Sequence, residues 1–212
     1  MTIQWIKNNT VAPIAQFIFA HGAGAGSDSE FMQTMALLLS EHGIDVGLFD
    51  FKYMQIAKQT NKRRPPERAP KLLQDFSHIM NHAQPELPLF IGGKSMGGRM
   101  ASMLACDTPH TVRGILAFGY PFHPPGKPEK LRTAHFCDIP CPFLVLQGER
   151  DTFGTREELA TMDMPKEPQY CWLPDGDHSL KPRKKSGFTE QQNRVTAAHA
   201  AQAFIKQIIE AL

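Results

Sequence analysis

The sequence has little cysteine and lacks the paired spacing that metal and redox sites use. Only four of its 212 residues are cysteines, and no two of them form a C-x-x-C pair. This argues against structural zinc and against thioredoxin-like redox chemistry. We expect reduced thiols in a cytoplasmic protein, with no metal and no cofactor. The cysteines are Cys106, Cys137, Cys141 and Cys171.

Long apolar runs and a strong excess of either charge are also absent. No stretch approaches the roughly 20 apolar residues that a membrane-spanning helix needs. The apolar run 11–20 resembles a secretory signal, but Pro13 and Gln16 interrupt it and His21 stands where a small residue is required. A formal net charge of +2 does not by itself indicate nucleic-acid binding. We therefore expect neither a membrane nor a nucleic-acid partner, and a single globular domain over residues 1–212.

Short β-rich apolar runs alternate with segments of helical periodicity along the chain. This alternation predicts an α/β fold with a doubly wound, mostly parallel sheet and helices on both faces. Strands are predicted at 14–20, 45–51, 87–93, 112–120, 141–148 and 168–174. Helices are predicted at about 30–42, 68–83, 96–106, 155–162 and 189–211, with Leu212 continuing the spacing of the last helix.

Two connecting segments are rich in proline or basic residues. Residues 54–66 are polar and basic and contain proline, so we expect an exposed loop there. The connection 121–140 has room for one short helix, but not for a lid domain. An open site of this kind predicts little interfacial activation by long-chain substrates.

The glycine-rich stretch 92–98 admits two interpretations. A phosphate-binding P-loop that ends in Lys94 and Ser95 requires glycine at position 88, which is Pro88. The other glycine-rich stretch, HGAGAG at 21–26, fails the dinucleotide-binding pattern because Ser27 stands where glycine or alanine is needed. Neither stretch therefore predicts a nucleotide site.

Residues 93–97 instead match the nucleophile-elbow pattern G-x-S-x-G, between a predicted strand and a predicted helix. So sharp a turn strains the backbone of Ser95, and side chains in place of Gly93 and Gly97 would clash across it. The following helix N-terminus favours developing negative charge beside Ser95. The alternative is a glycine-rich junction in which Ser95 only caps the helix.

A nucleophilic serine needs a histidine base and an acid that orients the histidine. His178 follows the predicted strand 168–174 and Asp151 follows the strand 141–148, which is the chain order expected after an elbow serine. We predict Ser95 as nucleophile, His178 as general base and Asp151 as the acid, all on exposed loops. Glu149, Asp175 and Asp177 are the alternative acids. The histidines His42, His78, His82, His110 and His199 fall near helices, and His21, His123 and His135 precede Asp151.

An oxyanion hole needs two backbone N–H groups beside the serine. We predict that Met96 supplies one and that Ala23, in the loop after the first predicted core strand, supplies the other. His21 and Lys94 are predicted to contact substrate. The alternative is that 21–24 is merely a flexible glycine loop.

Four motifs together resemble the α/β-hydrolase superfamily: HGAGAG at 21–26, GKSMG at 93–97, GERD at 148–151 and GDH at 176–178. The missing lid resembles the small dienelactone hydrolase-like branch. The stretches 92–99, 123–132 and 148–155 are similar to a group that includes a testis-expressed protein and a histone acetyltransferase complex subunit. The resemblance implies a carboxylesterase-like serine hydrolase that cleaves a small ester or related acyl substrate through an acyl-enzyme. Dienelactone enzymes use cysteine where this chain has Ser95, so their own activity is not implied.

Basic residues gather near the predicted site in the sequence. They are Lys94, Arg99, Arg150 and the run 181–185. Together they favour an anionic acyl substrate. The alternative is that they are solvated or structural charges. A second function class is a non-catalytic interaction scaffold, because fold does not determine function. Chromatin association in the resembled group leaves a protein partner open. The ordered triad candidates favour the enzyme.

Overall fold

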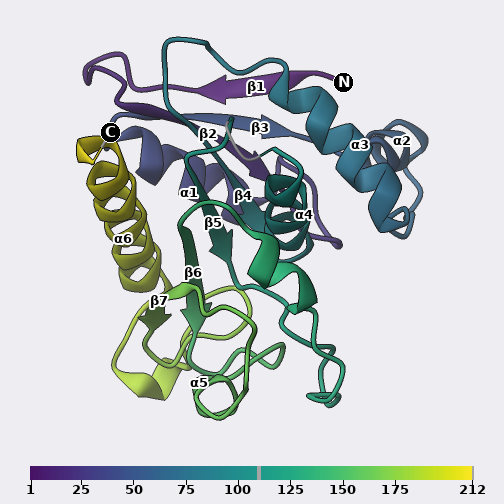
Figure 1. The fold of residues 1–212 in the computed structure, drawn as a ribbon, viewed down its shortest axis with the longest axis vertical. Coiled ribbons are helices and arrows are strands. Elements are labelled where there is room, and N and C mark those ends of the chain that lie inside the picture. The colour runs from purple at the N-terminus through teal and green to yellow at the C-terminus, as the bar shows by residue number, and fades with distance from the viewer. Residues whose placement is uncertain (109–110, 212) are drawn as a thin grey trace.

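Seven strands form one sheet in this protein, and helices cover both of its faces (Figure 1). The computed structural model describes residues 1–108 and 111–211, so the predictions that concern His110 and Leu212 lie outside it. The strands are β1 (Ile3–Ile6), β2 (Ala15–Ala20), β3 (Ile44–Phe49), β4 (Leu89–Lys94), β5 (Gly114–Phe118), β6 (Phe143–Gly148) and β7 (Gln169–Leu173). No helix within the described ranges is long and apolar enough to cross a bilayer.

The spatial order of the strands is β1-β3-β2-β4-β5-β6-β7. Only β1 runs antiparallel to its neighbour among the described strand pairs. The strands β2 to β6 are buried along their whole length, which explains why they read as continuous apolar runs. The predicted doubly wound, mostly parallel sheet is therefore confirmed.

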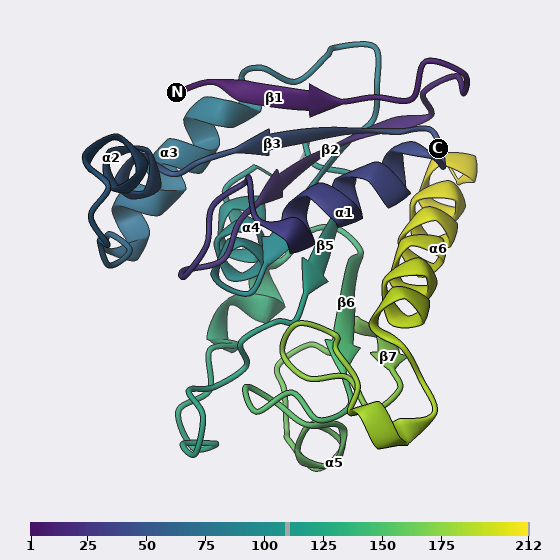
Figure 2. The ribbon, with the colours of Figure 1, turned by 180° about the vertical axis from the view of Figure 1, so that it is seen from behind.

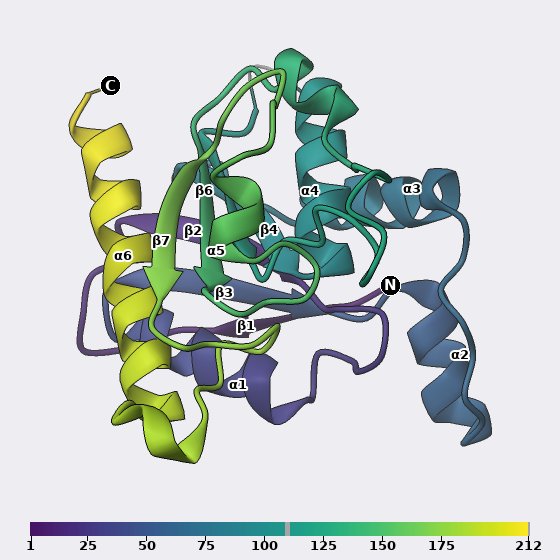
Figure 3. The same ribbon diagram turned by 90° about the horizontal axis from the view of Figure 1, so that it is seen from below.

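Two helix pairs form the outer layers (Figures 1 and 3). On one face α1 (Glu30–Ser40) packs against α6 (Glu190–Glu210), and on the other α3 (Ala69–Met80) packs against α4 (Met96–Cys106). Each pair covers its own cluster of buried apolar side chains. The remaining helical segments are α2 (Lys52–Thr60), α5 (Arg156–Leu159), η1 (Ala134–Asp138) and η2 (Lys184–Ser186).

The predicted strands and helices lie within a few residues of the observed ones, with two exceptions. The expected loop at 54–66 is wrong, because its first half is helical in α2. This helix buries only Tyr53 of its own residues and is tied to the chain after β3 through Lys58 and Asp50, so tertiary contacts outweigh a weak local pattern. The strand β1 was not predicted, because a segment of four residues carries little periodicity. Its extended conformation depends on antiparallel pairing with β3.

The loops after β2 and β4 meet at the point where the order in which strands are added to the sheet reverses. The strand β2 has β3 on one side and β4 on the other, so the chain winds outward both ways from this point (Figure 1). Figure 2 shows the same sheet from behind. Crevices at such switch points, beyond the carboxyl ends of the strands, are the usual ligand sites of open α/β sheets. Ala20 and Gly93 pair at the ends of β2 and β4, which brings the loop that begins at His21 beside Ser95.

Candidate active site

Ser95 occupies a strained turn between β4 and α4. Its backbone has φ 51° and ψ −114°, a conformation that residues other than glycine rarely adopt. The turn is held by the Ser95 N–H, which donates to the Phe118 carbonyl over 3.0 Å. A Cβ at Gly93 would lie 2.6 Å from the Ala20 oxygen, and one at Gly97 would lie 2.8 Å from the His21 oxygen. Both glycines are therefore required by close backbone approach, as the sequence predicted.

A chain of hydrogen bonds joins the three predicted triad residues. His178 Nδ1 lies 2.8 Å from Asp151 Oδ2, and His178 Nε2 lies 2.8 Å from Ser95 Oγ. Because a carboxylate only accepts, Nδ1 carries the proton and Nε2 of the neutral ring can accept from the Ser95 hydroxyl. The expectation that all three side chains are exposed is wrong for Asp151, which is completely buried.

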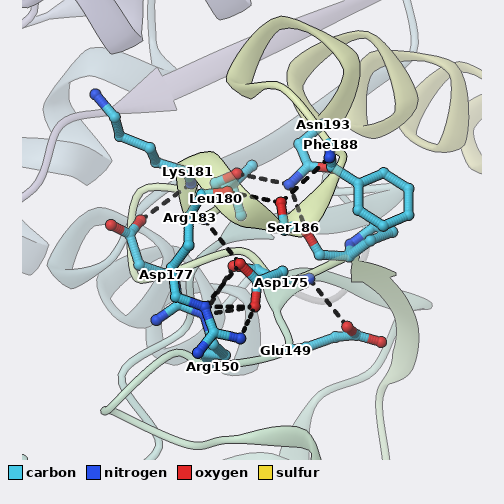
Figure 4. Close-up of polar contacts among 11 residues, drawn as sticks. Glu149, Arg150, Asp175, Asp177, Leu180, Lys181, Arg183, Ser186, Phe188 and Asn193 are labelled. Atoms are coloured by element: carbon cyan, nitrogen blue, oxygen red, sulfur yellow. Dashed lines mark hydrogen bonds and ion pairs between the residues drawn. The ribbon is translucent and has the colours of Figure 1, made fainter.

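The alternative acids have other partners (Figure 4). Glu149 accepts from Arg156 over 2.7 Å and from the Asp175 N–H over 3.0 Å. Asp177 accepts from the N–H groups of Ser179 and Lys181 and closes the turn after His178. Asp151 is thus the carboxylate that meets the imidazole.

The loop after β2 lies beside the serine and presents its backbone. The Tyr53 hydroxyl donates to the carbonyl oxygens of Ala23 (3.1 Å) and Gly22 (3.3 Å). Within the described part of the chain, the N–H groups of Ala23 and Met96 have no protein acceptor. For Met96 this follows from its place in the first turn of α4. Both predicted oxyanion donors therefore remain available to a ligand.

A cavity of about 370 Å³ opens over Ser95 and His178. Its walls are mostly apolar, and Phe153 stacks on the imidazole with ring centroids 4.2 Å apart. The lining residues are Gly22, Ala23, Gly24, Ala25, Ser29, Phe31, Met32, Lys94, Ser95, Phe153, His178 and Ser179. No group of three or more side chains suited to a metal ion occurs among the residues that the structure describes.

Comparison with known proteins identifies the family. A model of the alpha/beta hydrolase domain matches residues 13–206. The chain belongs to the alpha/beta hydrolase family. Its fold is similar to a dienelactone hydrolase from Anabaena variabilis, with a TM-score of 0.66 and 19% identity over 97% of this chain and 90% of that one.

Two further solved structures share the fold of this alpha/beta hydrolase. Est1E from Butyrivibrio proteoclasticus, solved with bound ferulic acid, has a TM-score of 0.70 and 12% identity over 99% of this chain and 95% of that one. A lidless α/β serine hydrolase from Xanthomonas campestris has a TM-score of 0.66 and 16% identity over 95% and 87%. At these identities the likeness concerns the fold alone.

Gln147 is a site residue that the sequence analysis of this hydrolase missed. Its Nε2 donates to Asp151 Oδ2 over 3.0 Å, and its Oε1 accepts from the Tyr120 N–H over 2.8 Å. The other carboxylate oxygen of Asp151 accepts from the Phe153 N–H over 2.9 Å. The available signal was a lone amide in the otherwise apolar strand 143–148, because a buried amide needs partners.

Lys94 and His21, the two predicted substrate contacts, behave differently. Lys94 lines the cavity, but its ammonium donates to the His178 carbonyl and lies over the Phe31 ring. Burial lowers the pKa of Lys94 to about 8, although Asp151 and Asp177 oppose that shift.

His21 does not reach the cavity, so its predicted substrate contact is wrong. The side chain is completely buried, and Nε2 accepts from the Phe51 N–H over 3.1 Å. Nδ1 must then carry the proton and donate to the Gly22 carbonyl over 2.7 Å. Burial lowers the pKa of His21, so the ring stays neutral and holds the loop from behind.

Most basic residues expected to attract an anionic substrate serve structural roles instead. Arg150 Nε and Arg183 Nε lie 3.0 Å and 2.9 Å from Asp175 Oδ1 (Figure 4). Lys181 pairs with Glu190. The hydrogen bond from Arg183 lowers the pKa of the Asp175 carboxyl to about 2. Arg99 is not among the residues that line the cavity. Arg150, Lys181 and Arg183 thus brace the loop that carries His178, and the basis expected for anion preference is not found there.

Proposed function

We propose that this alpha/beta hydrolase is a serine hydrolase that cleaves a small ester or related acyl substrate. The observation that carries the proposal is the continuous chain from Asp151 through His178 to the Oγ of a strained Ser95, with both links 2.8 Å long. Family membership supports a hydrolase. A cavity of about 370 Å³ without a lid suits a small acyl group rather than a long chain.

The geometry accounts for each step of acyl transfer. His178 Nε2 takes the hydroxyl proton as Ser95 Oγ attacks the carbonyl carbon, and Asp151 stabilises the imidazolium that results. The N–H groups of Ala23 and Met96 receive the oxyanion, each contributing roughly 2.7–4 kcal/mol to the transition state. His178 then gives the proton to the leaving group, and water releases the acyl-enzyme by the same route.

A non-catalytic scaffold is the weaker candidate. A non-glycine residue at φ 51° costs about 1–3 kcal/mol, and only a nucleophile gives a reason to keep that strain at Ser95. The resemblance to the testis-expressed and acetyltransferase-subunit group stays a prediction. So do a protein partner, a cytoplasmic location and the single domain over 1–212.

Covalent labelling with a fluorophosphonate, followed by peptide mapping, tests the enzyme directly. The label should attach to Ser95, be lost in Ser95→Ala and be nearly lost in His178→Ala. Hydrolysis of p-nitrophenyl acetate should fall about 10⁴- to 10⁶-fold in each variant and little further in the double variant, because triad members act as a unit. The exposed residues Ser77 and His82 supply the controls Ser77→Ala and His82→Ala. A folded wild type that takes no label, and whose esterase rate survives Ser95→Ala, contradicts the proposal.

A further inference from the structure

A second cavity, of about 470 Å³, adjoins the loop after β2, residues 21–26, on the side of α2. We call this segment the oxyanion loop, because it carries the proposed donor Ala23. It shares Ala23 and Gly24 with the cavity over Ser95. Four of its nine lining residues are cationic and none is acidic. The cationic ones are Lys58, Lys62, Arg63 and Arg64.

The end of α2 brings these cations to the cavity. Asn61 adopts the left-handed conformation, with φ 48° and ψ 37°, and its N–H donates to the Lys58 carbonyl. The Lys62 N–H donates to the Ala57 carbonyl over 3.1 Å, which turns the chain back at the helix end. Pro65 and Pro66 follow directly, and proline restricts the backbone before it to extended conformations. The basic segment is thus partly ordered before any ligand binds.

Most of the charge in this cavity is unneutralised. Lys58 is already paired, with Asp28 at 2.8 Å and with Asp50 at 2.5 Å, and so it ties α2 to the chain around the oxyanion loop. Lys62, Arg63 and Arg64 are exposed, and none of them forms an ion pair with a carboxylate in the described ranges. They contrast with Arg150 and Arg183, which both form ion pairs with Asp175.

The rim between the two cavities is low. Ala23, Gly24 and Ala25 are exposed, and none has a side chain larger than a methyl group. A substrate whose carbonyl carbon lies at Ser95 can therefore extend across this rim without displacing a side chain. Its far end would then meet three cations, and no carboxylate residue is among the described residues that line this cavity.

We propose that the α2 cavity binds an anionic group of the substrate, a phosphate remote from the scissile bond, through Lys62, Arg63 and Arg64. The inference rests on the proposed function, since it assigns the substrate class of the same site. Guanidinium groups match the oxygens of phosphate in bidentate fashion, and three cations suit a dianion better than a single carboxylate. Restriction of the segment by Pro65 and Pro66 lowers the ordering cost of binding.

A matched pair of esters tests this assignment. One is 4-(2-hydroxyethyl)phenyl acetate, and the other is its phosphate monoester, so only the remote anion differs. We expect kcat/KM at low salt to favour the phosphorylated ester by at least about 10-fold, because hydrogen bonds to charged groups contribute more than neutral ones. This ratio should approach one in Arg63→Gln/Arg64→Gln, and in the wild type it should shrink as salt rises. The double variant Lys127→Gln/Lys130→Gln removes the same charge from an exposed loop and should keep the ratio.

Direct binding separates failure of the cavity from failure of the catalyst. Calorimetry on Ser95→Ala should show tighter binding of the phosphorylated ester than of the neutral one, with inorganic phosphate as competitor. Loss of that difference in Ser95→Ala/Arg63→Gln/Arg64→Gln supports the cavity even if the wild type hydrolyses neither ester. Equal rates for both esters in an active wild type, or equal binding to Ser95→Ala, overturns the inference and leaves the hydrolase proposal intact. A preference for a carboxylate-bearing ester over the phosphate overturns the choice of phosphate.

Discussion

The ammonium of Lys94, the residue just before the elbow serine, donates a hydrogen bond to the main-chain carbonyl of His178. This contact links β4 to the loop after β7 independently of the hydrogen bond between the side chains of His178 and Ser95. His178 is thus held at three places, by Asp151 at Nδ1, by Phe153 against its ring and by Lys94 at its main-chain carbonyl. Lys94 is a positioning residue in this arrangement, because it acts through His178.

Replacing Lys94 by methionine should lower kcat by roughly 10- to 100-fold with KM nearly unchanged, since small displacements of a catalytic group are costly. Steady-state kinetics with p-nitrophenyl acetate measures the effects on kcat and on KM separately. Lys94→Gln keeps a donor on a shorter chain and should recover part of the rate. Full kcat in a folded Lys94→Met protein contradicts the positioning role.

Lys94 also makes folding stability depend on pH in the alkaline range. The folded pKa is lowered from 10.5 to about 8 by burial, so the unfolded state binds more protons between these values. The cost of burying the charge is complete below pH 8 and is relieved as pH rises toward 10.5. Compared with Lys94→Met, the wild type should gain up to about 3 kcal/mol of unfolding free energy over that window. Urea titrations of both proteins at several pH values measure this difference, and parallel pH profiles contradict it.

Asp151→Asn should harm both catalysis and stability. The three groups that contact the Asp151 carboxylate are all donors, so the amide NH₂ of asparagine must face one of them. We expect kcat to fall about 10⁴-fold and the free energy of unfolding to fall by about 1–3 kcal/mol. Glu149→Gln alters the neighbouring carboxylate that does not contact His178, and should change kcat little. Kinetics and urea unfolding of both variants check these effects. An Asp151→Asn protein with the free energy of unfolding of the wild type contradicts the buried network.

The strain at Ser95 predicts an unusual order of stability among inactive variants. Glycine tolerates φ 51° with ψ −114°, whereas alanine keeps the strain. Ser95→Gly should therefore be more stable than Ser95→Ala by about 1 kcal/mol, even though glycine ordinarily costs stability through its flexible unfolded state. Thermal and urea unfolding decide the order. If Ser95→Ala proves at least as stable as Ser95→Gly, the turn is not strained.

Several features followed from local sequence alone. The alternation of apolar runs with helical periodicity predicted the parallel sheet, because strands buried on both faces must be continuously apolar. The spacing of Gly93, Ser95 and Gly97 predicted the elbow, because a Cβ at either glycine would lie less than 3.0 Å from neighbouring backbone atoms. Chain order placed Asp151 and His178 after successive strands that end at the same edge of the sheet.

Other features depended on contacts between segments far apart in the chain. The burial of Asp151 appears only when the loops after β6 and β7 pack together. Gln147 contacts the nearby Asp151 while its Oε1 accepts from the distant Tyr120 N–H. The helix α2 forms because Tyr53 is buried and Lys58 pairs with Asp50, neither of which local periodicity records. Charge shows the same division. The sequence gives the number of cations, but folding pairs Arg183 with Asp175 and leaves Arg63, beside the oxyanion loop, without an ion pair among the described residues. Partners for a charge are set by distance in space, and distance in space is a property of the tertiary structure.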